Sequence, residues 1–475
     1  MSDITLPETN TIFPAVIDGQ KVQAESYFDV VNPRTGRAFA SVPDLSAEQM
    51  RGSLSAAEKG FELWSATSPA ERKETILCYA DILEQNRERL IALLMEETGK
   101  PRDNAEYDFG MLTTCLRFFV EEFERLDQPV LHDPEGRFLH YVQRQPLGVV
   151  VGFLAWNFPL LNIGYKIGPA LAAGCSVIIK PAALTPLASL EVAYLAKEAG
   201  IPDGVVNVVT ASNHVVTEEL LKSDIPSLVT MIGSTRGGLE VMSSSCTSIK
   251  HFSVELGGNA PVVVYPDADI RDAANKVVDL KFSNSGQVCV SPNRCFVHES
   301  VYEKFIEFAR ERAASVEMGP LISDRERARV LGLVEGALQE GAMAVCGGEA
   351  VEGEGFFMEP TILAGVTSGM TIANTEIFGP VLPVISYSDD DDEIALANGT
   401  EFGLAAYVFT NNLSKGLKAA RDIKSGSVCV NEPHYSVQLP HGGLKQSGTG
   451  KDCSRYSLQE YLTLKRISVC LESED

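Results

Sequence analysis

Four short apolar runs set the architecture of this chain: LGVVVGFLA (147–155), CSVIIK (175–180), VVNVV (205–209) and PSLVTMI (226–232). Each run is rich in β-branched residues, and segments with a helical pattern lie between them. Strands of a parallel sheet are apolar on both sides because helices cover both faces of the sheet. The runs therefore predict a βαβαβαβ series, which is an open parallel α/β sheet.

A second alternation of strands and helices begins near Ala260. Its runs are APVVVY (260–265), RCFVH (294–298), AVCGG (344–348), PVLPVISY (380–387), LAAYVF (404–409) and SGSVCVN (425–431). Helical patterns start at about Ala268 and Val301 and recur between the later runs. We therefore expect two tandem α/β domains, joined near residues 255–259.

Four further segments lie outside these two series of runs. Residues 15–31 predict a β-hairpin and strand, because AVIDGQKV (15–22) carries an Asp-Gly turn between apolar stretches. Residues 45–124 have a helical pattern. PEGRFLHYVQRQP (134–146) alternates like an arm or an edge strand. YLTLKRISV (461–469) is a lone strand that pairs either with this arm or with another subunit, and unpaired strands of this kind favour a homo-oligomer.

Composition excludes several classes of function. The 475 residues are too many for one core, and a formal net charge of −24 disfavours nucleic acid and anionic membranes as partners. The N-terminal residues lack the pattern of a signal peptide, and no run reaches the roughly 18 apolar residues of a membrane span. Ten cysteines without metal-ligand spacing predict reduced thiols, no metal site and a cytoplasmic location.

Three residues are candidates for catalysis, and each has a structural alternative. Cys289, in FSNSGQVCV (282–290), follows a predicted helix and a glycine turn, although most free cysteines are small buried hydrophobes. Glu255 precedes a double glycine, as a mobile general base or as an ordinary strand-end glutamate. Asn157, in AWNFP (155–159), offers an amide for an oxyanion hole or is a turn residue before proline.

The nucleotide-binding signals are incomplete. The first α/β block lacks GxGxxG, but GSTRGG (233–238) follows a strand and opens a helix, where backbone N–H groups favour a phosphate. The second strand ends at Lys180, in KPAALTP (180–186), with no acid for a ribose 2′-hydroxyl. Lys180 either tolerates a 2′-phosphate, which leans toward NADP, or simply extends its ammonium group to solvent.

Together these segments stand in the order typical of one family. The motifs are PLGVVVGFLAWNFP (146–159), CSVIIKPAALTP (175–186), GSTRGG (233–238), VELGGNAP (254–261), FSNSGQVC (282–289), EIFGPVLPV (376–384) and PHGGLKQSGTGK (440–451). From Ile17 to Lys465 the chain resembles the aldehyde dehydrogenase superfamily. The resemblance implies a two-domain α/β fold of that type with a small β oligomerisation arm, assembled as a homodimer or homotetramer.

The resemblance also implies a role for each matching residue. Cys289 corresponds to the nucleophile, Glu255 to the general base, and Asn157 to the oxyanion hole, which it forms with the Cys289 backbone N–H. Lys166 and Asp452 occupy the positions of a charged relay. The expected contacts to NAD or NADP are Trp156, Lys180, Ala183, Gly233, Ser234, Glu376 and Phe378. The implied domains are 1–130 with 147–255 for the dinucleotide, 256–445 for catalysis, and 131–146 with 454–475 for the arm.

The absence of the expected arginines narrows the class of aldehyde that the chain would accept. The chain most resembles the NAD(P)-dependent succinate-semialdehyde and lactaldehyde group, but Tyr165 and Ser283 stand where arginines are expected to bind a carboxylate. The expected pocket comprises Tyr165, Ser283, Val288, Val290, His434 and His441, which suits a small polar aldehyde. The alternatives are succinate-semialdehyde oxidation itself, a thiol esterase, and a non-catalytic binding or structural protein that retains the fold. Ala183 replaces the usual ribose-binding glutamate.

Overall fold

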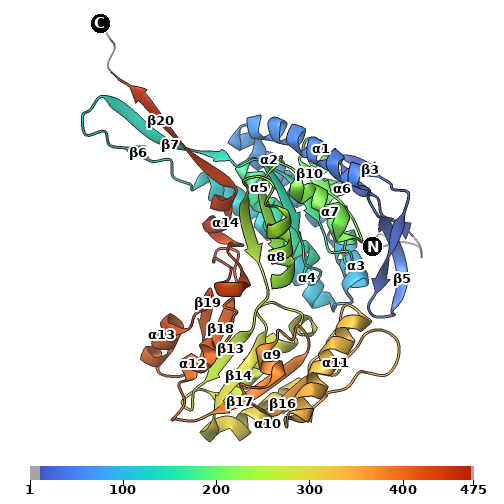
Figure 1. Cartoon of the computed structure of the whole chain (residues 1–475), viewed down its shortest axis with the longest axis vertical. Helices are drawn as coiled ribbons and strands as arrows, with labels where there is room; N and C mark the ends of the chain where they lie inside the picture. The colour runs from blue at the N-terminus through green and yellow to red at the C-terminus, as the bar shows by residue number, and fades with distance from the viewer. Residues whose placement is uncertain (1–10, 472–475) are drawn as a thin grey trace.

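The computed structural model describes residues 11–471 and contains two seven-stranded sheets, one in each lobe of the molecule (Figure 1). The first sheet has the order β12-β11-β8-β9-β10-β2-β3. Its parallel strands are β8 (Val149–Phe153), β9 (Ser176–Lys180), β10 (Val206–Val208), β11 (Pro226–Ile232) and β12 (His251–Glu255). Three of the four predicted runs are fully buried strands, and β11 is buried over most of its length, as expected for a sheet covered on both faces.

The predicted Asp-Gly hairpin closes one edge of this sheet. β2 (Ala15–Ile17) and β3 (Gln20–Val22) pair antiparallel, and β2 pairs antiparallel with β10. Asp18 and Gly19 both have positive φ, 53° and 64°, which a two-residue turn between twisted strands requires. The expected parallel sheet therefore has an antiparallel edge, because a hairpin from before the helical block adds to it.

Helices cover both faces of the first sheet. The predicted helical block comprises α1 (Ala47–Ala66), α2 (Pro69–Gln85), α3 (Arg87–Thr98) and α4 (Arg102–Glu124), and the crossover helices are α5 (Pro159–Ala173), α6 (Leu187–Glu198), α7 (His214–Lys222) and α8 (Thr235–Ser244). Capping boxes at Ser46 and Ser68 start α1 and α2. Helix α5 is buried on every side. Its Gly164 and Gly168 lie so close to α4 that an added Cβ would be 3.0 Å from the Leu112 Cα and 2.9 Å from the Phe119 ring.

The second sheet has the order β15-β16-β17-β14-β13-β18-β19. Its strands are β13 (Ala260–Val264), β14 (Pro292–His298), β15 (Met343–Cys346), β16 (Thr361–Val366), β17 (Val381–Tyr387), β18 (Ala405–Phe409) and β19 (Ser427–Val430). The helices of this lobe are α9 (Ile270–Phe282), α10 (Tyr302–Ala313), α11 (Asp324–Gln339), α12 (Glu393–Asn398) and α13 (Leu413–Asp422). All strands are parallel except β15, which forms an antiparallel edge. The chain passes from β12 into β13 through buried residues 256–259, where the junction between the domains is predicted.

The predicted arm and the terminal strand pair with each other. β20 (Leu462–Cys470) runs antiparallel to β7 (Phe138–Pro146), and β6 (Val130–Leu131) adds a third strand. This sheet projects from the first lobe (Figure 1), and helix α14 (Ser454–Glu460) leads into it. Of the two partners considered for the terminal strand, the arm of the same chain is the one found here. A fourth sheet comprises β1 (Thr11–Ile12), β4 (Tyr27–Asn32) and β5 (Arg37–Pro43).

The role of the domains remains a prediction from the sequence, and residues 1–10 and 472–475 of the predicted bounds lie outside the described residues. None of the helices between residues 11 and 471 is long and apolar enough to cross a membrane.

Candidate active site

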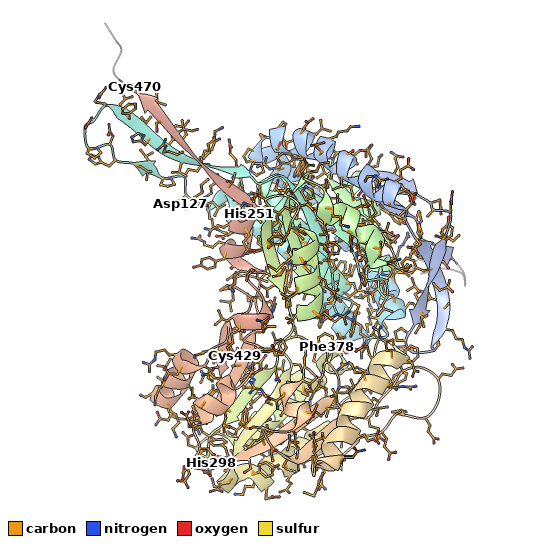
Figure 2. All side chains as sticks on the ribbon, in the orientation of Figure 1. Asp127, His251, His298, Phe378, Cys429 and Cys470 are labelled. Atoms are coloured by element: carbon orange, nitrogen blue, oxygen red, sulfur yellow. The ribbon has the colours of Figure 1, made fainter. Side chains whose placement is uncertain are left out.

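A cavity of about 770 Å³ is lined by residues of both lobes. Most of the residues that the sequence singles out contribute to its wall: Trp156, Asn157, Tyr165, Gly233, Ser234, Glu255, Ser283, Val288, Cys289, Val290, Glu376, Phe378, His434, His441 and Asp452. The labelled Phe378 lies at the junction of the two lobes (Figure 2). Three predicted site residues are not part of the wall: Lys166, which lies behind it, and Lys180 and Ala183.

Cys289 follows a backbone turn that is strained in the folded chain. Asn284, Ser285 and Gly286 have φ values of 47°, 57° and 73°, a left-handed conformation that only glycine adopts without steric cost. Packing holds this turn in place, because the Ser285 hydroxyl donates to the Gly319 carbonyl at 2.7 Å. A Cβ on Gly286 would lie 2.1 Å from the Gly379 carbonyl oxygen. The turn thus presents a half-buried Cys289 to the cavity.

The surroundings of Cys289 keep its thiol protonated. Burial, followed by the nearby carboxyls of Glu376 and Glu255, raises the pKa of Cys289 to about 12. Thiolate is the nucleophilic form of cysteine, so a base or a positive charge has to act on this thiol before it can react. The sequence gives no indication of this pKa, because the groups that set it come from distant segments.

Asn157 is fixed directly beside the cysteine loop. Its Nδ2 donates to the Gln287 carbonyl at 3.0 Å, two residues before Cys289, and its Oδ1 accepts from Asn162 Nδ2 at 3.4 Å. These two contacts orient the amide so that its N–H groups face the loop. Lys100 supports the same segment from behind, since its ammonium donates to the Asn157 carbonyl at 2.8 Å. The amide is thus fixed beside the cysteine loop, and its role in an oxyanion hole stays a prediction.

Glu255 ends β12 inside the protein. Neither of its carboxyl oxygens has a hydrogen-bond partner among the described residues, and burial raises the pKa of Glu255 well above its usual range. The carboxyl lies against the loop that starts at His441, where a Cβ on Gly442 would be 2.5 Å from Glu255 Oε1. An acid held in this way accepts a proton readily once it is ionised, as a general base must.

The double glycine after Glu255 has a purpose other than mobility. A Cβ on Gly257 would lie 2.6 Å from a carboxyl oxygen of Glu376, and one on Gly258 would lie 2.4 Å from the Cys289 carbonyl oxygen. Both glycines are buried. They permit the junction between the two lobes to pass directly under the cysteine and Glu376. Close packing is therefore one reason for the glycines, while the mobility of this segment stays a prediction.

Lys166 and Asp452 form a buried ion pair next to Glu255. Lys166 Nζ lies 2.7 Å from Asp452 Oδ1, and both side chains are almost fully buried. Asp452 exchanges two backbone hydrogen bonds with His441, at 2.8 and 2.7 Å, and its Oδ2 has no partner among the described residues. Burial lowers the pKa of His441 to about 4, so its imidazole is neutral at physiological pH. Lys166 does not line the cavity itself, and its charge acts there through its ion pair with Asp452.

One side of the cavity has the features of a dinucleotide site. Ser234 caps α8, its Oγ accepting from the Gly237 N–H at 3.1 Å, so the N-terminus of this helix opens onto the cavity wall. The rings of Trp156 and Phe378 meet edge to face at 5.2 Å. Glu376 accepts from the Gly258 N–H at 2.8 Å, and burial raises its pKa to about 7. These residues fit a cofactor with a phosphate, a ribose and a flat ring.

The predicted adenosine contacts lie farther along the first sheet. Lys180 is buried at the end of β9, and burial lowers its pKa to about 8. Asp44 lies close enough to act on this amine, and it accepts hydrogen bonds from Ser212. No sequence motif marks Asp44, because the acid comes from the segment before α1 rather than from the strand end. The strand end itself carries no acid, as the sequence indicates, but Asp44 brings a carboxylate near Lys180 from another segment.

The opposite end of the cavity contains a tyrosine that sequence reasoning misses. The Tyr435 hydroxyl hydrogen-bonds to the Tyr165 hydroxyl and lies 3.2 Å from Cys453 Sγ, and its ring meets His441 edge to face. No motif marks Tyr435, since it lies in an irregular segment beside the exposed His434. Of the described residues that line the cavity, Arg329 alone is a lysine or arginine, and it donates to the backbone carbonyls of residues 376 and 377.

Comparisons with known proteins agree with this geometry. Residues 20–467 match a family model that is described as "Aldehyde dehydrogenase family". The NADP(+)-dependent succinate-semialdehyde dehydrogenase of Escherichia coli K12 is 36% identical, over 96% of this chain and 98% of that protein. The 3-sulfolactaldehyde dehydrogenase of Pseudomonas putida is also 36% identical, over 97% of both chains. The non-phosphorylating aspartate-semialdehyde dehydrogenase of Halomonas elongata is 39% identical, over 95% of this chain and 94% of that one.

Solved structures give the same result. A crystal structure of an E. coli NADP-dependent enzyme superposes with a TM-score of 0.95 at 35% identity, covering 97% of this chain and 98% of that one. A 3,6-anhydro-L-galactose dehydrogenase in complex with NAP superposes with a TM-score of 0.93 at 34% identity, covering 97% and 100%.

Proposed function

Since the chain belongs to the aldehyde dehydrogenase family, we propose that it oxidises a small, uncharged polar aldehyde to the carboxylic acid through a thioester on Cys289. It is an NAD(P)-dependent oxidoreductase, and the aldehyde and the roles of individual residues are the proposal. The observation that carries it is the convergence of Cys289, Asn157 and Glu255 on one cavity from three separate segments. A non-catalytic protein that retained the fold would have no need of this convergence.

The first chemical step belongs to Cys289 and Asn157. An aldehyde carbon gives up a hydride only after a nucleophile has made it tetrahedral. Cys289 supplies that nucleophile as a thiolate, after its thiol proton has passed to solvent. The alkoxide that forms accepts hydrogen bonds from the Asn157 amide and the Cys289 backbone N–H. The Asn157 amide is already oriented toward the loop by its bond to the Gln287 carbonyl. NAD(P)+, when bound, supplies the hydride acceptor.

The second step is hydrolysis of the thioester, and it belongs to Glu255. The ionised carboxylate takes a proton from water as the water oxygen bonds to the acyl carbon, and the carbon–sulfur bond breaks with its electron pair returning to Cys289. The unpartnered oxygens of Glu255 support this role, because none of the protein groups in the described part of the chain competes for their lone pairs. The Lys166–Asp452 pair lies beside this acid and sets the charge around it.

The proposed cofactor contacts follow the dinucleotide side of the cavity. The N-terminus of α8, with Ser234, would hold the pyrophosphate, Glu376 the nicotinamide ribose, and Phe378 with Trp156 the ring. Residues 1–130 with 147–255 would then form the dinucleotide-binding domain and 256–445 the catalytic domain. We propose that NADP is accepted, because Ala183 leaves room for a 2′-phosphate near Lys180. Both an NADP-named and an NAD+-bound relative are among the matches.

The substrate proposal follows from charge. A carboxylate tail would enter a cavity end where Tyr165 and Tyr435 bond to each other and where no lysine or arginine among residues 11–471 faces it. Burying an anion without a partner is costly, whereas a hydroxyl can exchange hydrogen bonds with tyrosine. A neutral hydroxylated or otherwise polar aldehyde therefore fits better than succinate semialdehyde, although relatives at 36% identity are named for that substrate.

Assembly and location follow from the same proposal. The projecting arm of β6, β7 and β20 is suited to pair with another subunit, as a homodimer or homotetramer, because β20 has an open edge. A nucleophilic thiol has to stay reduced, and the cytoplasm provides that environment.

The test is nucleotide reduction followed at about 340 nm, with a panel of hydroxylated, unsubstituted and carboxylate-bearing aldehydes and either NAD+ or NADP+. We expect reduction with the hydroxylated members and none with Cys289→Ser. Ester hydrolysis without nucleotide, and no reduction with any aldehyde, would make the protein a thiol esterase instead. Preference for succinate semialdehyde would refute the charge argument while leaving the reaction class intact.

A further inference from the structure

A buried ion pair of the first lobe lies behind the wall of the cavity and has no part in the reaction steps proposed for this protein. Lys100 follows α3 and Asp108 lies in α4, and Lys100 Nζ is 2.7 Å from Asp108 Oδ2. Both side chains are almost fully buried, and neither residue lines the cavity. Taking two charges out of water is costly, and a pair recovers that cost only when further groups bond to it. The other partners of this pair therefore indicate what it does.

The second partner of Lys100 is the backbone of Asn157. The ammonium donates to the Asn157 carbonyl at 2.8 Å, and Asn284 Nδ2 donates to the same oxygen at 3.1 Å. A carbonyl oxygen has two lone pairs, so these two bonds use both of them. Lys100 belongs to the first lobe, whereas Asn284 lies in the turn of the second lobe that precedes Cys289. The peptide group after Asn157 is therefore held by both lobes at once.

Asp108 holds the residues that follow Asn157. Helix α5 begins directly after Phe158, which makes no side-chain cap bond of its own. Asp108 supplies the cap from α4 instead, since its Oδ1 accepts from the Leu161 N–H at 2.6 Å. The Lys100 ammonium also lies 4.3 Å from the centre of the Phe158 ring. The ion pair thus holds the first turn of α5 as well as the carbonyl that precedes it.

This fixed backbone determines where the Asn157 amide lies. Asn157 Nδ2 carries two N–H groups, and one of them donates to the Gln287 carbonyl at 3.0 Å, which leaves the other for an alkoxide. An oxyanion hole works when its donors are in place before the charge forms, and a displacement of about 1 Å costs roughly a hundredfold in rate. We propose that Lys100 is a positioning residue for the oxyanion hole, because it holds Asn157 beside the cysteine loop through the carbonyl and through Asp108. The inference rests on the proposed function.

The test is a double-mutant cycle in the full-length protein, with nucleotide reduction in a single turnover followed by stopped flow. Lys100→Met removes the donor to the Asn157 carbonyl, so the rate should fall about tenfold to a hundredfold. Asn157→Ala removes the amide itself and should lower the rate about a hundredfold. Because Lys100 acts through that amide, adding Lys100→Met to Asn157→Ala should change the rate by less than about twofold. A purely structural effect of Lys100 would lower the rate by the same factor in both backgrounds.

Two further variants separate positioning from stability. Lys100→Met leaves Asp108 buried without its ion partner, so the protein should unfold at lower urea. The double variant Lys100→Met with Asp108→Asn removes both charges, and it should recover stability yet reduce nucleotide as slowly as Lys100→Met. Lys250→Met is the matched control, because Lys250 is also buried and donates to the Ser245 carbonyl at 3.4 Å, but away from the cavity wall. Its single-turnover rate should equal that of the wild type.

Two results would overturn the positioning role of Lys100. One is an equal loss of rate from Lys100→Met in the wild-type and Asn157→Ala backgrounds. The other is a single-turnover rate that stays within about twofold of the wild type in Lys100→Met and in its double variant with Asp108→Asn. Wild-type protein that reduces neither NAD+ nor NADP+ with any aldehyde would instead overturn the proposed function.

Discussion

Replacing Gly258 with alanine should disable the active site without unfolding the protein. The φ of Gly258 is not in the left-handed region, so the backbone itself accepts alanine. The added Cβ would lie 2.4 Å from the Cys289 carbonyl oxygen, and ordinary contact begins at 3.4 Å, so the cysteine segment has to move by about 1 Å. A displacement of about 1 Å at a reacting group costs roughly a hundredfold in rate. Overpacking of this kind costs about 1–3 kcal/mol in stability, which a chain of this size tolerates.

The assay compares kcat/KM with thermal unfolding for Gly258→Ala and for Gly332→Ala. Gly332 lies in α11 with no atom within 4 Å of an added Cβ, so the same chemical change should leave kcat/KM unchanged and stabilise the helix by up to about 1 kcal/mol. We expect kcat/KM of Gly258→Ala to be about a hundredfold below the wild type while its unfolding stays cooperative. A folded Gly258→Ala enzyme within twofold of the wild type would refute the packing explanation of the double glycine.

Three more outcomes follow from the same cavity. Burial and two carboxyls raise the pKa of Cys289 to about 12. The rate of alkylation of this thiol by iodoacetamide in the free protein should therefore be low at pH 7 and should still be rising at pH 10. A rate that reaches a plateau near pH 8 would contradict the raised pKa. Tyr165→Arg should raise kcat/KM for a carboxylate-bearing aldehyde by about tenfold or more, through one charge-assisted hydrogen bond; the same panel of aldehydes measures it. Lys166→Met should lower the free energy of unfolding by about 3–5 kcal/mol, because it leaves Asp452 buried and unpaired. The double variant Lys166→Met with Asp452→Asn should recover most of this loss. Urea titrations measure both free energies.

The sequence predicts the sheets well because local patterns determine them. Runs such as 147–155 and 260–265 are apolar on both faces, short and rich in β-branched residues, which favours covered parallel strands. The antiparallel edges are harder to predict. β2 joins β10 across nearly two hundred residues of chain, and nothing within residues 15–17 indicates which strand is its partner. The same holds for β20, whose pairing with β7 depends on where the two ends of the chain meet.

The site is predicted only in part, for a related reason. Motifs mark Cys289, Glu255 and Asn157 because their segments resemble a family, and the cavity unites all three. Tyr435 and Asp44 lie in segments without a motif, and their importance comes from contacts with residues far away in the chain. The pKa of a group is likewise a property of its surroundings, so neither the protonated Cys289 nor the neutral His441 can be inferred from spacing.

These pKa values also explain how one cavity can hold a nucleophile and a base that do not react before the substrates bind. Burial raises the pKa of both Cys289 and Glu255, so the protein disfavours the charged form of each group. A positive charge that enters such a cavity is screened weakly, and it stabilises a thiolate and a carboxylate at once. We therefore expect a positive charge on the dinucleotide side, where Glu376 and the N-terminus of α8 lie, to favour the thiolate of Cys289. On the proposed function, this predicts an order in which the nucleotide binds before the aldehyde.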